Sequence, residues 1–321
     1  MIDLKKVRSA LLGFAVGNAL GVPVEFSSKE EREADPVVGM RGYGIRYQPP
    51  GVWSADTSLV IATMESVAYL KKIDACDIMK NFAGWYKENL FTATGHRFGI
   101  DFNIQRAINA FLNGTPIIEC GLGGVLSNSN SSLARMLPMV FYPYDCDIPV
   151  SEALTKVGEL SSLTHAHFVS IMACELYYML AHELLKGENP ANALSNVIKL
   201  ATEWYCDPAY APMFGFYSRL LSDRFASLPE NEIRGTGYVV DTLEAVVWCL
   251  LNTTDYKSLV LKAVNLGDDT DTVAAIAGGL GGILYGEDGI PADWLDVLKR
   301  KEYLEEIAQS FYEAISFLHW I

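Results

Sequence analysis

The chain has 321 residues, half of them hydrophobic, and a formal net charge of −14 at pH 7. This length allows one large domain or two, and so acidic a chain is not expected to bind a nucleic-acid backbone or an anionic membrane. The chain can still bind an anionic small molecule if a metal or helix N-termini supply local positive charge.

The N-terminal segment predicts a helix over residues 4 to 20, with apolar side chains near helical spacing. Its basic start and apolar run also resemble a signal peptide, but Asn18 interrupts the run and no A-x-A cleavage site follows. We therefore expect a first core helix. The 6 cysteines are scattered without a CxxC pair or zinc-ligand spacing, which favours free buried thiols and a cytoplasmic location.

A polar segment over residues 27 to 53 is expected to be a long loop, and loops of this length are often functional. Glu25 precedes it between apolar residues, which favours burial near a site. At the end of the loop, Ser54 is a good N-cap, and Asp56 falls in the first turn of a helix expected to run to about Lys71. Taken alone, Ser54 and Asp56 are more simply explained as capping residues.

The rest of the chain predicts helices but no strand alternation, so the expected class is all-α, with one domain over residues 1 to 321. A Gly-, Ser- and Asn-rich loop is expected over residues 121 to 138; such loops cradle phosphate, but flexible loops share the composition. Arg135 is expected to pair with a structural Asp, and Thr164 to cap a long helix. The other helices are expected over residues 74 to 88, 104 to 112, 151 to 161, 164 to 187, 190 to 222 with a break at 207–208, and 294 to 319. Residues 235 to 252 are expected to run from a glycine loop into a buried helix, and residues 255 to 266 precede the acidic segment.

The most informative segment begins with Asp268, Asp269 and Asp271 and continues through Thr272 into an apolar run with four glycines. The run predicts a buried central helix. Glycine in a helix costs roughly 1 kcal/mol relative to alanine, so we expect close approach of another backbone to offset that cost. One Asp can cap the helix, whereas three crowded carboxylates repel one another unless a hard cation binds them. These residues alone leave a metal site and an elaborate cap equally open.

Six segments, in order over about 270 residues, resemble motifs of the ADP-ribosylglycohydrolase family. GNALGVPVEF resembles the family motif GDALGxPxE, SADT resembles TDDT, and SNSSLAR resembles NGxxMR. SLTH, GTGYVVDTLEAVVWC and GDDTDTVAAIAGGLGGILYG match further blocks, and the family includes the dinitrogenase reductase-activating glycohydrolases. The resemblance implies an orthogonal helical bundle around a site for two divalent cations, Mg²⁺ or Mn²⁺.

The resemblance also implies site residues, by position in the motifs. Metal ligands fall on Glu25, Ser54, Asp56, Asp269, Asp271 and Thr272, of which Glu25, Asp56 and Asp271 are also expected to take part in catalysis. Substrate contacts fall on Ser127, Asn130, Ser132, His165, Gly237, Tyr238 and Asp101, and the phosphate-contacting loop falls on Ser127 to Ser132. The implied reaction is hydrolysis of the glycosidic bond between ADP-ribose and a protein side chain, so the expected partner is an ADP-ribosylated protein or a small ADP-ribosyl substrate.

The departures from the motifs gather at the same site. Ala55 replaces the first Asp of TDDT, Asn18 replaces the Asp of GDALG, and Gly99 stands where FDIG has its Asp. Ser131 replaces the glycine of the NG loop, and Asp268 is an extra acid that could compensate for Ala55. A second hypothesis is therefore a catalytically impaired ADP-ribose-binding or scaffold protein. Because Ala55 removes a carboxylate, we expect one firmly held cation and one weak position.

Overall fold

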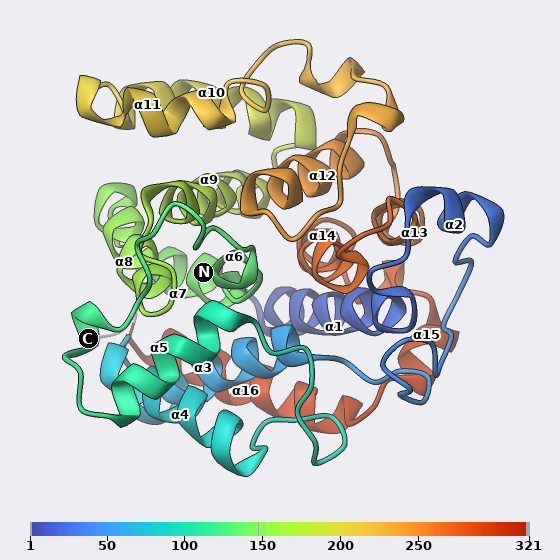
Figure 1. Cartoon of the computed structure of the whole chain (residues 1–321), viewed down its shortest axis with the longest axis horizontal. Coiled ribbons are helices and arrows are strands. Elements are labelled where there is room, and N and C mark those ends of the chain that lie inside the picture. The colour runs from blue at the N-terminus through green and yellow to red at the C-terminus, as the bar shows by residue number, and fades with distance from the viewer. Residues whose placement is uncertain (1, 147, 319–321) are drawn as a thin grey trace.

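The structure is a computed structural model that describes residues 2–146 and 148–318, and its regular elements there are helices joined by loops and short 3-10 turns (Figure 1). Pairing of extended backbone in these residues is limited to isolated bridges, so the predicted all-α class is confirmed. The helices are α1 Leu4–Gly21, α2 Lys29–Ala34, α3 Ala55–Leu70, α4 Ala75–Glu88, α5 Phe102–Leu112, α6 Ser131–Ala134, α7 Leu137–Asp145, α8 Val150–Ser162, α9 Phe168–Leu185, α10 Pro190–Trp204, α11 Ala211–Phe214, α12 Val239–Leu251, α13 Tyr256–Asn265, α14 Thr270–Tyr285, α15 Ala292–Val297 and α16 Lys301–Leu318.

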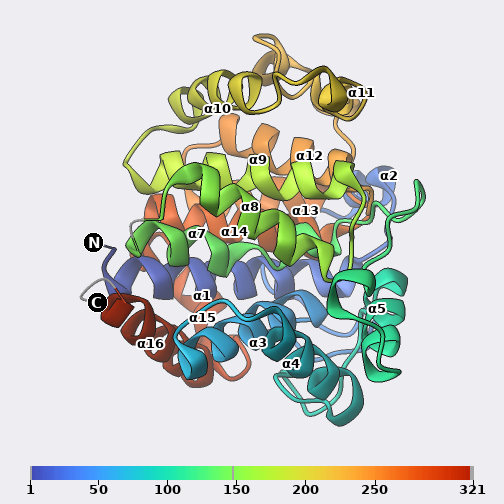
Figure 2. The same ribbon diagram turned by 90° about the vertical axis from the view of Figure 1, so that its left-hand side faces the viewer.

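Two buried helices, α1 and α14, lie side by side at the centre of the molecule (Figures 1 and 2). Glycines make their contact possible. A Cβ atom on Gly17 would lie 2.0 Å from the carbonyl oxygen of Ala274, and one on Gly282 would lie 2.2 Å from that of Ser9. Real Cβ atoms do not approach so closely, so the backbones touch where no side chain separates them. The close approach predicted from the glycines is confirmed.

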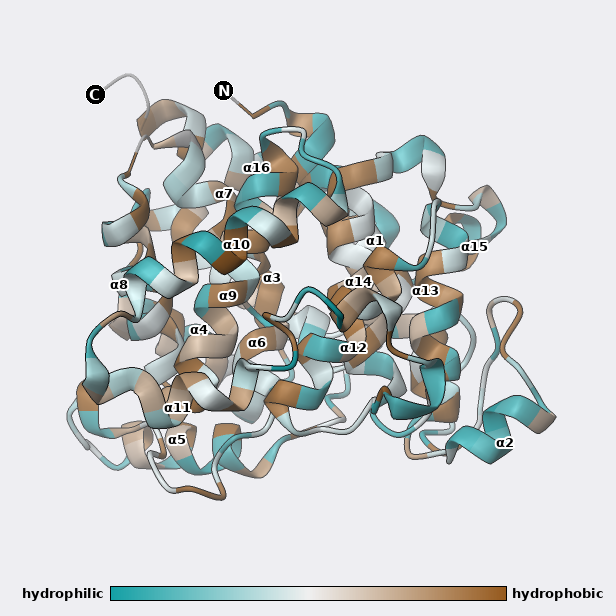
Figure 3. Ribbon diagram, turned by 90° about the horizontal axis from the view of Figure 1, so that it is seen from above, coloured by the Kyte–Doolittle hydropathy of each residue, from teal (hydrophilic) through white to brown (hydrophobic). Residues whose placement is uncertain are grey.

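The other helices cover this central pair in layers (Figure 2). On one side α9 and α12 pack on α14, with α10 outside them, and on the other side α16 packs on α1 and α3. The α1 region and α9 are long and apolar enough to cross a membrane by length and composition, but 94% and 83% of those residues are buried inside the molecule. Packing against neighbouring helices accounts for their apolar character. Figure 3 shows α2, in contrast, as a hydrophilic helix at the edge of the molecule.

Most predicted helices are confirmed, with corrections in the polar segments. Residues 27–53 contain α2, which begins at a capping box formed by Ser28 and Glu31. Residues 121–138 contain α6 and the start of α7 rather than loop alone. The last predicted helix ends at His319, which lies outside the described residues. Cys120, Cys174 and Cys249 are buried free thiols, as expected, whereas the free thiols of Cys76 and Cys206 are exposed.

The long helix after the SLTH segment begins later than predicted. Its N-cap is His167, whose ring Nδ1 accepts a bond from the backbone N–H of Val169 at 3.3 Å. Thr164 is therefore not the cap. Its hydroxyl instead forms a hydrogen bond with the ring of His165, one of the residues expected at the candidate site.

Candidate metal and substrate site

The acidic segments of the sequence converge where α14 begins against the end of α1. A Cβ atom on Gly21 would lie 2.3 Å from Cα of Asp271, so no larger residue leaves room for this approach. The hydroxyl of Thr270 donates to the carbonyl of Gly21 at 2.9 Å and fixes the contact. Glu25 follows α1 by one short turn, and it is thereby placed beside the first residues of α14.

The side chains at the starts of α3 and α14 do not cap these helices. Ser54 and Asp269 occupy the N-cap positions but form no side-chain capping bond, whereas Asp74 and Asp255 accept such bonds at α4 and α13. The Ser54 hydroxyl instead donates to Oδ2 of Asp271 at 2.9 Å. Of the two explanations that the sequence left open, the structure disfavours elaborate capping.

A cavity of about 280 Å³ opens at this point, and its lining includes the carboxylates of Glu25, Asp56, Asp269 and Asp271, with that of Asp101 as a fifth. One oxygen atom from each of Glu25, Asp269 and Asp271 lies within 4.8 Å of the other two. Oδ1 of Asp271 is buried and has no hydrogen-bond partner among the described residues. Hard divalent cations prefer oxygen ligands, and a buried carboxylate oxygen is costly when it is left unpaired. This set of donors fits such a cation.

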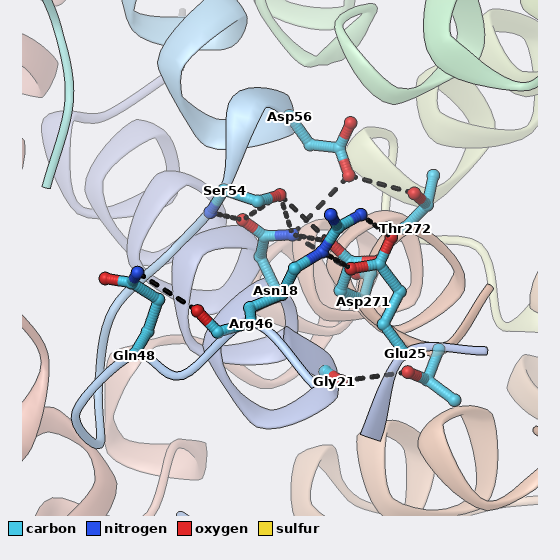
Figure 4. Close-up of polar contacts among 10 residues, drawn as sticks. Asn18, Gly21, Glu25, Arg46, Gln48, Ser54, Asp56, Asp271 and Thr272 are labelled. Atoms are coloured by element: carbon cyan, nitrogen blue, oxygen red, sulfur yellow. Dashed lines mark hydrogen bonds and ion pairs between the residues drawn. The ribbon is translucent and has the colours of Figure 1, made fainter. Parts of the chain in front are cut away.

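Asn18 on α1 joins the two acidic helix starts (Figure 4). Its side-chain oxygen accepts a bond from the backbone N–H of Ser54 at 2.7 Å and from the Thr57 hydroxyl at 3.0 Å. Its amide nitrogen donates to the Ser54 hydroxyl at 3.0 Å and lies 3.3 Å from Oδ2 of Asp271. An Asp at this position would add another negative charge to the cluster. The Asn instead supplies donors to it, so this departure from the family motif has a structural role.

Burial and mutual repulsion raise the pKa values of three carboxyl groups in the cluster. Burial raises the pKa of Asp56 to about 7, and the charge of Asp269 adds to the effect. Burial also raises the pKa of Asp271 well above its ordinary value, with Glu25, Asp56 and Asp269 contributing, and it raises the pKa of Asp269. Positive charge inside the cavity would favour the ionised forms. The negative charge of the cluster must therefore be reduced, either by protonation of its carboxylates or by a bound cation.

Several residues implied to contact substrate line the same cavity: Asp101, Asn130 and Gly237. Nδ2 of Asn130 donates to Oδ2 of Asp269 at 2.7 Å, and a Cβ atom on Gly237 would lie 3.2 Å from that oxygen. Four others lie outside the lining, and two of these, Ser132 and His165, are fully buried. The four are Ser127, Ser132, His165 and Tyr238.

Two of the departures from the family motifs, Gly99 and Ser131, line the cavity, and Asp268 does not. Gly99 lines the cavity with φ of +71°, and a Cβ atom on it would lie 3.8 Å from that of Ala55. Ser131 is also in the lining. Asp268 is exposed and outside the cluster, and its backbone N–H donates to the carbonyl of Ser27 at 2.7 Å. The expectation that Asp268 compensates for Ala55 is therefore wrong.

The cavity lining also includes Arg46, which the sequence did not indicate, and Ser129, which it indicated only as part of the phosphate-contacting loop Ser127 to Ser132. Arg46 lies in the long segment before α3. The sequence pointed to Arg46 only indirectly, because loops as long as this segment are often functional. Ser129 belongs to the Gly-, Ser- and Asn-rich segment, in which neighbouring serines gave no reason to prefer it. Arg46 is the only basic residue in the described lining.

The fold and the site define an all-helical protein with a candidate metal site at the starts of two helices. Comparisons with known proteins show which family has this combination. The family model for ADP-ribosylglycohydrolase matches residues 2–318, so the chain belongs to this family of enzymes. It is 28% identical over 320 residues to ADP-ribosylarginine hydrolase Tri1 of Serratia proteamaculans (strain 568), covering 97% of this chain and 80% of the relative. It is 28% identical over 299 residues to the ADP-ribosyl-dinitrogen reductase glycohydrolase of Rhodospirillum rubrum, covering 91% and 90%.

A solved structure, described as an ADP-ribosylglycohydrolase-related protein complex, has the same fold. It matches with a TM-score of 0.80 at 27% identity, and the match covers 98% of each chain. The resemblance found in the sequence motifs is therefore confirmed across the chain and not only at the motifs.

Proposed function

We propose that the protein is a metal-dependent hydrolase that cleaves the glycosidic bond between ADP-ribose and a protein side chain. The observation that carries this proposal is the buried, unpartnered Oδ1 of Asp271 inside a cluster of carboxylates. The two relatives named above act on ADP-ribosylarginine and on ADP-ribosylated dinitrogen reductase. An ADP-ribosylated protein or a small ADP-ribosyl compound is therefore the proposed partner, and an arginine linkage is the first to test.

The proposed cofactor is Mg²⁺ or Mn²⁺, held by Glu25, Asp56, Asp269 and Asp271 with the hydroxyls of Ser54 and Thr272. The Ser54 hydroxyl donates to Asp271, and that of Thr272 donates to Oδ2 of Asp56 at 2.9 Å. A hydroxyl that donates its proton to a carboxylate keeps lone pairs for a cation. When bound, the ion would act as a Lewis acid that orients ligand oxygens and lowers the pKa of a water molecule.

The proposed catalytic groups are the carboxylates of Glu25, Asp56 and Asp271. They line one cavity, so each can reach a ligand that fills it. A carboxylate in this position accepts a proton from the attacking water and stabilises oxocarbenium-like charge on the ribose. Asp101, Asn130 and Gly237 are proposed to hold the substrate. Four further residues, Ser127, Ser132, His165 and Tyr238, lie outside the cavity lining, and the first two belong to the loop proposed to bind the diphosphate.

The alternative of a non-catalytic binding or scaffold protein is not favoured. Its motivation was Ala55, Asn18 and Gly99, yet the carboxylates of the proposed metal ligands Glu25, Asp56, Asp269 and Asp271 are all present in the cavity lining. Free cysteines support the proposed cytoplasmic location, because reducing conditions keep thiols free.

The test is release of ADP-ribose from arginine-linked and serine-linked ADP-ribosyl peptides, with Mg²⁺ or Mn²⁺ present and after treatment with a chelator. We expect turnover that depends on the ion and is absent from Asp271→Asn, which keeps the size of the side chain. Absence of turnover on both linkages while calorimetry shows bound metal would contradict the proposal. Binding of ADP-ribose without turnover would favour the binding protein instead.

A further inference from the structure

The hydroxyl of Ser129 lies in the wall of the cavity, between two side chains of other elements. Its oxygen is 2.6 Å from Nε2 of His165 and 3.0 Å from Nδ2 of Asn103. The backbone of Ser129 pairs with Tyr238, which holds the serine in place. Ser129 lines the cavity, whereas His165 is fully buried behind it. Any ligand in the cavity therefore meets the serine before the histidine.

A buried arginine sets the direction of the hydrogen bonds behind this wall. Arg135 on the turn after α6 is fully buried and, among the described residues, forms no ion pair with a carboxylate, so the predicted pairing with an Asp is wrong. Burial lowers the pKa of Arg135 to about 10, which leaves it charged at neutral pH. A guanidinium only donates. Its Nη2 donates to the Thr164 hydroxyl at 2.7 Å and to the Ser161 carbonyl at 3.3 Å.

Thr164 accepts from Arg135, and among its hydrogen-bond partners in the described residues only Nδ1 of His165, 2.8 Å away, can accept its hydroxyl proton. A buried hydroxyl proton is costly to leave unpaired, so Thr164 donates to Nδ1. Burial lowers the pKa of His165 to about 4, so the ring is neutral near pH 7 and carries one proton. With Nδ1 accepting, that proton is on Nε2. Oδ1 of Asp101 lies 3.6 Å from Nε2, and a carboxylate there also favours an N–H over a bare lone pair.

The Nε2–H of His165 therefore donates to Ser129, and so does the side-chain amide of Asn103. A serine hydroxyl has two acceptor lone pairs and one proton. With both lone pairs engaged by protein donors, the proton has no partner in the wall and points toward the cavity. The rest of this cavity is rich in carboxylates, so a donor for the oxygens of an anionic ligand is valuable there.

We propose that Ser129 donates a hydrogen bond to an oxygen of the ADP-ribosyl ligand, and that Arg135, Thr164 and His165 are positioning residues that fix its direction. The inference rests on the proposed function for the identity of the ligand. The direction of the hydrogen bonds is inferred from the protein's own residues and is independent of the proposed function. The assignment also changes the role of His165, which was expected to contact substrate itself and instead acts through Ser129.

The first test concerns the direction alone and needs no ligand. The ¹⁵N resonances of the His165 ring are measured in the full chain at pH 7 and assigned by their loss in His165→Gln. We expect the neutral tautomer protonated on Nε2, and we expect Thr164→Val, which keeps the shape but removes the hydroxyl, to shift the tautomer population. A ring protonated on Nδ1, or doubly protonated, would overturn the relay.

The second test measures ADP-ribose affinity by calorimetry in the metal-loaded protein. Loss of one hydrogen bond predicts about tenfold weaker binding for Ser129→Ala. Ser162→Ala is the matched control, because its hydroxyl donates to the carbonyl of Gly158 within α8, and its affinity should equal that of the unmodified protein. Thr164→Val should weaken binding in the unmodified background but not in Ser129→Ala, since residues acting in one network are not additive.

Equal affinity of Ser129→Ala and the unmodified protein would overturn the assignment of Ser129. Additive effects of Thr164→Val and Ser129→Ala would show that Thr164 acts by another route, and would overturn the positioning role. If the unmodified, metal-loaded protein binds no ADP-ribose, the proposed function and the ligand assignment both fail. The ¹⁵N measurement still decides the hydrogen-bond relay in that case, so the two failures are distinguishable.

Discussion

Arg46 and Glu25 form a bidentate ion pair in the cavity, with Nε of Arg46 2.5 Å from Oε2 and Nη2 2.6 Å from Oε1 (Figure 4). The hydrogen bonds that Arg46 donates to Glu25 raise the pKa of Arg46, and the charges of Asp271 and Asp269 add to the effect. The segment carrying Arg46 is anchored where the N–H of Ile45 donates to the carbonyl of Pro23 at 3.2 Å. The guanidinium thus supplies one positive charge to a site that also fits a divalent cation.

The first prediction is that Arg46 and a divalent cation compete for Glu25. Arg46→Gln should raise the affinity for Mg²⁺ or Mn²⁺ by about tenfold, because a charge-assisted bond to Glu25 no longer has to be broken. Titration calorimetry measures the change. Arg41→Gln is the control, since Arg41 pairs with exposed Asp35 in the same loop and should leave the affinity unchanged. A lower affinity in Arg46→Gln would mean that Arg46 holds Glu25 in place for the ion.

The second prediction concerns Asp271, whose Oδ2 accepts from Ser54 while Oδ1 is unpartnered. Asp271→Ala should abolish measurable binding of divalent cations and any hydrolase activity. It should not lower the melting temperature measured in chelator, because removal of one carboxylate relieves repulsion in the metal-free cluster. Calorimetry and thermal unfolding check the two halves separately. Metal affinity that survives the substitution would place the ion elsewhere.

Local sequence patterns were sufficient to predict the central helices and the acidic part of the site. The glycines of α14 required a close backbone neighbour, and α1 provides it. Asp74 was predicted at the start of α4 and caps it, because capping depends on neighbours three residues away. The crowding of Asp269 and Asp271 in one short segment raised the hypothesis of a metal site, but it left an elaborate cap equally open until the family motifs were considered.

Contacts between distant segments could not be predicted in this way. Arg46 and Ser129 reach partners 21 and 36 residues away, and no periodic pattern marks either. The position of Arg46 depends on Gly44, where a Cβ atom would lie 1.8 Å from the carbonyl oxygen of Pro23. Arg135 was expected to meet a carboxylate, yet the fold gives it the Thr164 hydroxyl. Such partners are set by how loops pack, which a single sequence does not state.

The third prediction is unequal occupancy of two cation positions. Ala55 leaves one family carboxylate missing, so calorimetry on the unmodified protein should show one firmly bound ion and one weak ion. Ala55→Asp should strengthen the weak position, because the new side chain starts beside Gly99 in the cavity wall and adds a hard oxygen ligand. Ala55→Asn is the control, with similar size but no charge, and should have a smaller effect. Two equally tight ions in the unmodified protein would contradict this arrangement.

The last prediction concerns Glu175 on α9, which is remote from the proposed ligands and accepts a hydrogen bond from the Tyr205 hydroxyl. Burial raises the pKa of Glu175 from 4.5 to about 7. Between these two values the folded protein binds more protons than the unfolded chain, so the free energy of unfolding should fall as pH rises through this window. Glu175→Gln has no such proton to lose.

The variant should therefore gain stability relative to the unmodified protein as pH rises from about 5 to 8, by on the order of 1–3 kcal/mol. Denaturant unfolding of both proteins in chelator measures the difference. The buried carboxylates of the cluster change stability in the same direction, but they are present in both proteins and cancel. Curves that stay parallel across this range would show that Glu175 is already ionised in the folded state.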